Sequence, residues 1–182
     1  MKRLIWLMLL SASVFSIAQG QTRKQTATNN PQEDENTILQ PATNKKDLYP
    51  ANVDAGREID EAIKRGAHAH KRVILIFGGN WCYDCHVLDQ ALHQGTAGKI
   101  VEESYELVHI DVGEFNKNLE IVKKYKVPLD KGVPAVAVLD GKGKLLYSAE
   151  GEFEAARKMM RKQLVDFLLK WRENKTAASG KS

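Results

Sequence analysis

Val73 to His93 reads VILIFGGNWCYDCHVLDQALH, and this stretch decides the fold. It opens with an apolar, largely β-branched run without helical periodicity, which predicts a buried strand. It closes with apolar residues spaced as they are along a helix. Between these parts stand Cys82 and Cys85, the only two cysteines in 182 residues. We therefore expect both sulfur atoms where a strand ends and a helix begins.

This position favours sulfur chemistry. The first turn of a helix has unpaired N–H groups and the positive end of the helix dipole, which stabilise an anion and lower the pKa of a cysteine. Cys82 is expected at the helix start as the more exposed and more acidic thiol. Cys85 lies one turn further on the same face and can close onto Cys82. Such a pair can carry two electrons by changing between a dithiol and a disulfide.

The first 20 residues have the pattern of a secretory signal peptide. Lys2 and Arg3 precede an apolar run, and Ala18-Gln19-Gly20 supplies small residues for a signal peptidase. Serines interrupt the run, which is shorter than the about 20 residues that span a membrane. We expect export with cleavage after Gly20, and retention as a membrane anchor is the alternative. Export implies an oxidising compartment, in which two cysteines tend to pair. A disulfide between residues only three apart closes a very small loop and adds little stability, which favours a redox-active pair over a structural one.

Composition divides the rest of the chain into three parts. Residues 21–47 are polar and nearly free of apolar side chains, which predicts a disordered linker. Residues 48–172 are long enough for one compact domain, and residues 173–182 form a polar, flexible tail. The net charge of +4 falls by two without Lys2 and Arg3, and both signs are interspersed. Binding to nucleic acid is therefore not expected.

Helices and strands alternate along the domain. We expect helices at 53–66, at 87–93, from Asn116 or Asn118 to Tyr125, and at 153–171, and we expect Gly66 to end the first of them. Strands are expected at 73–77, 105–112, 133–139 and 144–149. Helices between strands imply parallel crossovers, and the turn at 140–143 closes a final hairpin. The predicted fold class is α/β, with a central mixed β-sheet flanked by helices on both faces.

Histidines outside the cysteine motif do not suggest a metal site. His68 and His70 stand two residues apart, but no acid or cysteine lies beside them, so a solvated loop is the better interpretation. His109 lies inside an expected strand and is interpreted as a packed histidine rather than a catalyst. We expect no metal.

Two alternatives use the same cysteines. CYDCH, residues 82–86, is also the attachment motif of c-type haem, in which His86 would bind the iron with Met159 or Met160 opposite. Such haem domains are mainly helical, however, and this motif follows a β-branched strand. His86 is therefore interpreted as a surface residue of the helix beside the cysteines. A zinc site built from the cysteines and His86 or His93 would need four converging ligands, and no second Cys-x-x-Cys exists.

The pattern resembles the thioredoxin superfamily. The resemblance is carried by WCYDC (81–85) after a buried strand, by VHID (108–111) and by Val133-Pro134 at the head of a later strand. It covers about residues 48–171, and GGNWCYDCH (78–86) is similar to exported bacterial thiol–disulfide interchange proteins. The resemblance implies a thioredoxin fold, thiol–disulfide oxidoreductase activity, and no cofactor other than the redox-active disulfide.

The resemblance also implies roles for single residues. Cys82 would be the attacking thiol and Cys85 the resolving thiol. Pro134 would be a cis-proline facing the cysteines, and it would expose the backbone of Val133 to an extended substrate peptide. Trp81 would shield one side of the pair, with simple core packing as the alternative. A binding module of this fold without redox activity would not need both cysteines.

The sequence departs from thioredoxins in three ways. Ile76 stands where thioredoxins have a buried Asp that assists the resolving cysteine, and the loop before Pro134 is longer, which bears on the choice of partner. The residues between the cysteines are Tyr83-Asp84 instead of Gly-Pro. Asp84, expected as an exposed side chain, puts a negative charge beside the thiolate and partly opposes the helix dipole. A less stabilised thiolate makes a more reducing couple.

We therefore expect reduction of disulfides in exported proteins of the periplasm, by a monomer that a membrane-bound donor supplies with electrons. Disulfide oxidation or isomerisation by the same fold is the alternative.

Overall fold

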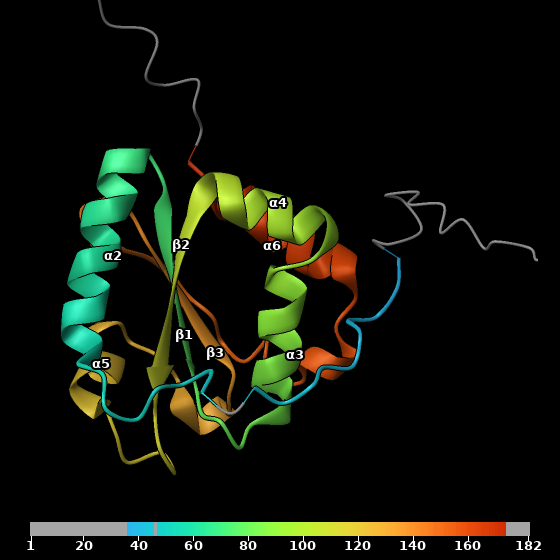
Figure 1. The fold of residues 1–182 in the computed structure, drawn as a ribbon, viewed down its shortest axis with the longest axis horizontal. Coiled ribbons are helices and arrows are strands. Elements are labelled where there is room, and N and C mark those ends of the chain that lie inside the picture. Colours follow the sequence, from blue (N-terminus) through green and yellow to red (C-terminus); the bar gives the residue numbers. More distant parts are fainter. Residues whose placement is uncertain (1–35, 46, 174–182) are drawn as a thin grey trace, which may run out of the picture.

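The computed structural model describes residues 36–45 and 47–173 (Figure 1). The expected signal peptide, the first part of the linker and nearly all of the C-terminal tail lie outside these residues. None of the helices in the described part is both long enough and apolar enough to span a bilayer.

A four-stranded mixed sheet forms the centre of the fold, in the order β2-β1-β3-β4. The strands are β1 (Arg72–Gly78), β2 (Tyr105–Asp111), β3 (Ala135–Leu139) and β4 (Leu145–Ser148). β1 and β2 run parallel, whereas β3 is antiparallel to both β1 and β4. The mixed sheet is confirmed, but a parallel crossover into β3 was wrong. The six residues of α5 (Leu119–Lys124) rise only about 9 Å, too little to carry the chain back along a strand of about 23 Å.

Helices cover both faces of the sheet, as expected (Figure 1). α2 (Ala55–Ala69) and α5 lie on one face, and α3 (Tyr83–Leu92), α4 (Gly95–Ser104) and α6 (Arg161–Trp171) lie on the other. Alternate residues of β1 serve the two cores. Val73, Leu75 and Phe77 pack with side chains of α2 and α5. Ile74 and Ile76 pack with side chains of α3, α4 and α6. Burial on both faces explains why this strand has no polar residue in its centre.

The first helix is longer than predicted. α2 continues past Gly66 and ends at His70, whose left-handed backbone (φ 54°) caps it. His68 therefore lies in the last helical turn instead of a loop. Gly66 lets the backbone of Lys71 pack closely against the helix, because a Cβ at Gly66 would lie only 2.9 Å from the Lys71 carbonyl oxygen.

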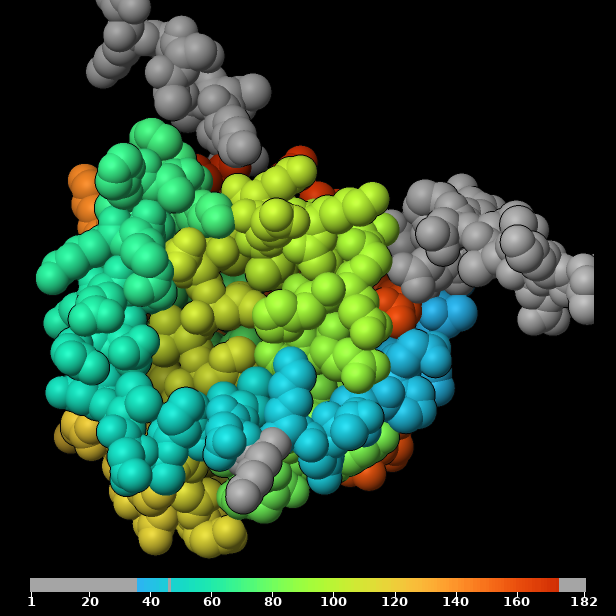
Figure 2. Space-filling view, viewed as in Figure 1, coloured from blue at the N-terminus to red at the C-terminus, as the bar shows by residue number. Residues whose placement is uncertain are grey.

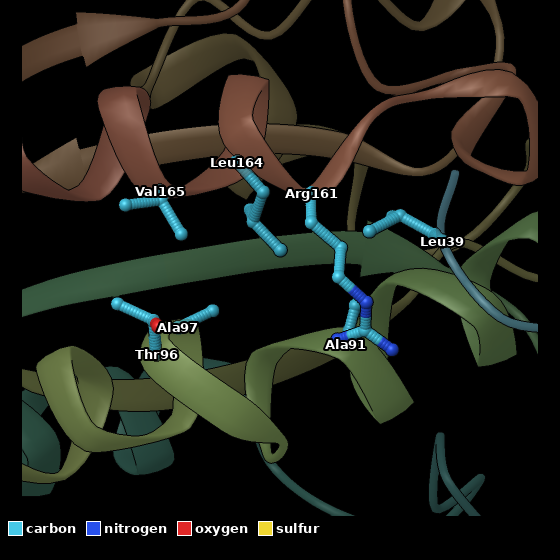
Figure 3. Close-up of a pocket in the computed structure, with 7 residues that line it drawn as sticks. All are labelled: Leu39, Ala91, Thr96, Ala97, Arg161, Leu164 and Val165. Carbon is cyan, nitrogen blue, oxygen red and sulfur yellow. The ribbon is translucent and has the colours of Figure 1, made fainter. Parts of the chain in front are cut away.

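Residues 36–45 pack against the domain, which contradicts the disordered linker predicted over 21–47 for this part. In Figure 2 the segment, coloured blue to cyan, lies across the green surface of α3. Its Leu39 is only 1% exposed, because it is inserted among α3, α4 and α6. Figure 3 shows Leu39 beside the small pocket that these helices enclose. One buried leucine in a polar segment was too weak a signal to read from composition.

The same segment explains why the last helix begins late. The backbone N–H of Leu39 donates to the Met159 carbonyl, and the N–H of Arg161 donates to the Thr37 carbonyl, both at 2.8 Å. This pairing requires extended backbone just before Arg161. α6 therefore begins at Arg161, eight residues after the predicted start at Phe153.

Candidate active site

Cys82 and Cys85 form a disulfide at the N-terminus of α3. Cys82 caps the helix, and its Sγ accepts a hydrogen bond from the Cys85 N–H at 3.2 Å. Cys82 is 5% exposed and Cys85 is fully buried. The pair therefore lies at the predicted junction of β1 and α3, and Cys82 is the less buried of the two residues.

The loop before β3 lies against this disulfide. The Val133 carbonyl oxygen is 3.6 Å from Cys82 Sγ, and the Val133–Pro134 peptide bond is cis. Because β3 runs antiparallel to β1, its first residues meet the last residues of β1, and this topology brings Val133 to the cysteines. The partial negative charge of the carbonyl oxygen disfavours a thiolate at Cys82.

Trp81 is an exposed side chain, so the alternative of core packing is wrong. It is 49% exposed, and its Nε1–H donates to the Gly113 carbonyl at 2.9 Å. Its ring centroid lies 5.7 Å from that of Phe115, which is 43% exposed. The two rings form an aromatic pair next to Cys82. Phe115 was not predicted, because nothing near it in sequence connects the loop after β2 with the cysteine motif.

Asp84 is buried and paired, contrary to the exposed charge expected from the sequence. Its carboxylate accepts hydrogen bonds from the Arg157 backbone N–H at 2.8 Å and from the Arg157 guanidinium, the shortest at 2.5 Å. The guanidinium also lies 5.5 Å from the centre of the Tyr83 ring. Arg157 compensates the charge of Asp84, so Asp84 cannot supply the reducing bias that the sequence suggested. No local signal predicts a partner 73 residues away.

His86 is likewise a buried residue and not the surface residue that the sequence suggested. The Lys45 backbone N–H donates to His86 Nδ1 at 3.1 Å, so the proton is assigned to Nε2, which contacts the Asn80 carbonyl at 2.9 Å. Both ring nitrogens are used, and both sulfurs are bonded to each other, which argues against haem attachment through residues 82–86. In residues 36–45 and 47–173, no three His, Cys, Asp or Glu side chains gather as metal ligands would.

A buried carboxylate does lie near the pair, but not at the position of Ile76. Asp89 in α3 is 1% exposed, and its oxygens lie 2.5 Å from Lys45 Nζ, 3.2 Å from His109 Nε2 and 3.4 Å from His93 Nδ1. Burial alone raises the pKa of Asp89, but the close contact with His109, the hydrogen bond from Lys45 and the charge of His93 outweigh it and lower this pKa to about 2. Asp89 is therefore ionised at neutral pH, and with so low a pKa it is too weak a base to take a proton from a thiol.

Asp89→Asn is expected to lower the free energy of unfolding at pH 7 by about 2 kcal/mol, because the variant loses the stabilised carboxylate. The folded pKa is depressed, so the wild-type advantage is present above the ordinary value of 3.8 and disappears as the pH falls through about 2. Urea unfolding of both proteins at a series of pH values measures this difference. Asp166→Asn, which removes an exposed ion pair with Lys162, is the control with little effect. Equal stability of wild type and Asp89→Asn at pH 7 contradicts the stabilising role of Asp89.

Comparisons with known proteins agree with this architecture. A family model described as thioredoxin-like matches residues 54–141. The disulphide isomerase from Xylella fastidiosa Temecula1 is 38% identical with a TM-score of 0.63, over 68% of this chain and 95% of that chain. The reduced C-terminal domain of DsbD from Neisseria meningitidis is 20% identical with a TM-score of 0.48, over 64% of this chain and 96% of that chain. Functionally curated proteins gave no significant match.

Proposed function

This chain belongs to the thioredoxin superfamily and is a thiol–disulfide oxidoreductase, and from that premise we propose that it reduces disulfide bonds in exported proteins. The observation that carries the proposal is the closed Cys82–Cys85 pair, with Cys82 at the start of a helix and Cys85 buried behind it. This arrangement suits one sulfur that meets the substrate and a second that releases it.

The proposed cycle starts from the reduced protein. Cys82 attacks an exposed client disulfide as a thiolate, which forms a Cys82–client bond and expels the second client sulfur as a thiolate. Cys85 then attacks Cys82 Sγ, which closes the protein disulfide and expels the first client sulfur. Each departing thiolate takes a proton from water. The client gains two electrons and the protein loses two, and no further cofactor enters.

The surroundings of Cys82 support reduction over oxidation. The Val133 carbonyl oxygen, 3.6 Å away, favours a bonded or protonated sulfur over a thiolate. A couple whose thiolate is less stabilised is more reducing. Arg157 compensates the charge of Asp84, so Asp84 no longer supports the proposed reducing direction. The contact between the Val133 carbonyl oxygen and Cys82 Sγ supports it instead.

The surface beside Cys82 suits an extended client segment. The backbone of Val133 can pair with a peptide that approaches the disulfide, and the exposed rings of Trp81 and Phe115 offer apolar contact. Tyr83, the residue after Cys82, contributes a ring whose centre lies 5.5 Å from the Arg157 guanidinium. These groups, with Pro134 and the paired Asp84, are the proposed substrate-supporting residues.

Export and an electron supply belong to the same proposal. Residues 1–20 have the secretory pattern, which supports a periplasmic location. In an oxidising compartment the dithiol is regenerated only if electrons arrive continuously, so we propose a membrane-bound donor as partner. The protein is proposed to work as a monomer.

Disulfide isomerisation is the second candidate, because the similar Xylella fastidiosa protein is described as a disulphide isomerase. Isomerisation begins with the same attack by Cys82 but leaves the protein reduced at the end. The electron count separates the two functions, since reduction oxidises one protein molecule per client disulfide and isomerisation oxidises none.

The equilibrium reduction potential of the Cys82–Cys85 couple tests whether the protein reduces or oxidises its clients. We expect about −200 mV or below, measured by equilibrating the purified protein with glutathione buffers and alkylating its free thiols. A value near about −120 mV is typical of strong oxidants and would overturn the reductase proposal.

A further inference from the structure

Tyr49 buries a hydroxyl group that has no use in the oxidised protein. The residue is 0% exposed, and its hydroxyl finds no hydrogen-bond partner within the described part of the chain. Leaving a buried polar group unpaired destabilises a folded protein. This destabilisation is explained if the hydroxyl gains a partner in another state of the protein.

The Tyr49 hydroxyl lies close to the sulfur of Cys85. A Cβ placed on Gly78 would lie 2.6 Å from the Tyr49 hydroxyl oxygen and 2.6 Å from Cys85 Sγ. The oxygen and the sulfur are therefore no more than twice that distance apart. Because Gly78 has no side chain, nothing from that residue separates them.

Contacts on two sides hold Tyr49 in this position. Its backbone N–H donates to Asn80 Oδ1 at 2.9 Å, and Asn80 Nδ2 donates to the Tyr49 carbonyl at 2.8 Å. Asn80 stands in the loop that leads to Cys82. The His109 ring packs edge-on against the Tyr49 ring, with 5.3 Å between centroids. The tyrosine is thus fixed to the loop that leads to Cys82 and to β2.

The hydroxyl can act as a donor and not as a base. Burial, together with the negative charges of Asp89 and Asp111, raises the pKa of Tyr49 well above its ordinary value. The phenol therefore keeps its proton over the whole working range of pH. A disulfide sulfur is a weak acceptor, whereas a thiolate forms a strong, charge-assisted hydrogen bond.

We propose that the Tyr49 hydroxyl donates a hydrogen bond to the Cys85 sulfur once the disulfide opens, and thereby stabilises the Cys85 thiolate for the resolving step. This inference rests on the proposed function, in which Cys85 is the resolving thiol. Thioredoxins carry a buried Asp where this chain has Ile76, so a neutral donor here takes the place of a buried base. Cys85 is fully buried, and its thiolate depends on such a donor, because burial disfavours the charged form.

The step balances without a further reagent. The Cys85 thiol loses its proton to water, and its sulfur attacks Cys82 Sγ in the mixed disulfide. The Cys82–Cys85 bond forms as the Cys82–client bond breaks, and the electron pair leaves on the client sulfur, which takes a proton from water. Tyr49 keeps its own proton throughout.

The direct test is the pKa of Cys85 in the Cys82→Ser protein, with and without Tyr49→Phe, followed by the ultraviolet absorbance of the thiolate. Loss of a hydrogen bond to a charged group is expected to raise the pKa of Cys85 by about one to two units. With Cys82 intact, Tyr49→Phe is expected to slow the resolution of a preformed mixed disulfide at neutral pH by about tenfold or more.

Tyr105→Phe is the matched control. Tyr105 is also buried, but its hydroxyl donates to the Leu168 carbonyl at 2.6 Å. Its loss is expected to lower the stability of the oxidised protein without changing the pKa of Cys85. Tyr49→Phe is expected to raise the pKa of Cys85 without lowering the stability of the oxidised protein, because the Tyr49 hydroxyl has no partner to lose in that state.

The outcomes separate this inference from the proposed function. A folded Tyr49→Phe protein with an unchanged Cys85 pKa overturns the role of Tyr49, even if the wild type reduces peptide disulfides normally. A wild type that reduces no peptide disulfide overturns the proposed function, and the titration of Cys85 still decides whether Tyr49 contacts its thiolate.

Discussion

Cys82→Ser is expected to abolish catalysed disulfide reduction, leaving only the background reaction of the chemical reductant. The serine hydroxyl is not ionised near neutral pH, so no nucleophile remains at the position that a client can reach. Reduction of a fluorescent peptide disulfide by dithiothreitol, with and without protein, measures the rate.

Cys85→Ser is the matched variant for this prediction. It keeps the attacking sulfur but lacks the sulfur that resolves the intermediate, so it is expected to accumulate a covalent adduct with the peptide, which mass spectrometry detects. A Cys82→Ser protein with a rate above background, or a Cys85→Ser protein that forms no adduct, contradicts the assigned roles.

Gly78→Ala is expected to destabilise the protein by about 1–3 kcal/mol, the usual cost of overpacking a core. The new methyl group would lie 2.6 Å from Cys85 Sγ and from the Tyr49 hydroxyl oxygen, and 2.8 Å from Tyr49 Cζ. All three atoms belong to buried side chains, so none can move aside into solvent. Urea unfolding under oxidising conditions measures the loss.

Gly141→Ala is the control for this substitution. A Cβ at Gly141 would lie 3.5 Å or more from its neighbours, which is ordinary van der Waals contact, and stability is expected to change little. Equal stability of Gly78→Ala and Gly141→Ala would contradict the close packing of the Tyr49 hydroxyl and Cys85 Sγ against Gly78.

Local sequence patterns predicted most of what frames the site. The β-branched run before Cys82 and the helical spacing after Cys85 placed the sulfurs at the junction of β1 and α3. The mixed sheet with helices on both faces followed from the alternation of patterns. These features depend on residues close together in the chain, which a period or a spacing can reveal.

What the sequence missed depends on contacts between distant residues. Asp84 looked like an exposed acid because its partner Arg157 lies 73 residues further on. His86 looked like a surface residue because the Lys45 backbone that covers it belongs to a polar segment 41 residues earlier. Tyr49 has no pattern that connects it with Cys85, since only the folded chain brings both to Gly78.

The central claim is that Cys82 and Cys85 exchange two electrons as one unit. The most direct measurement is the number of alkylated thiols per molecule across the glutathione titration described above, read by mass spectrometry. The account predicts a single transition between molecules with two alkylated thiols and molecules with none. Molecules with one alkylated thiol or a stable glutathione adduct at the midpoint, or no transition at all, would contradict it.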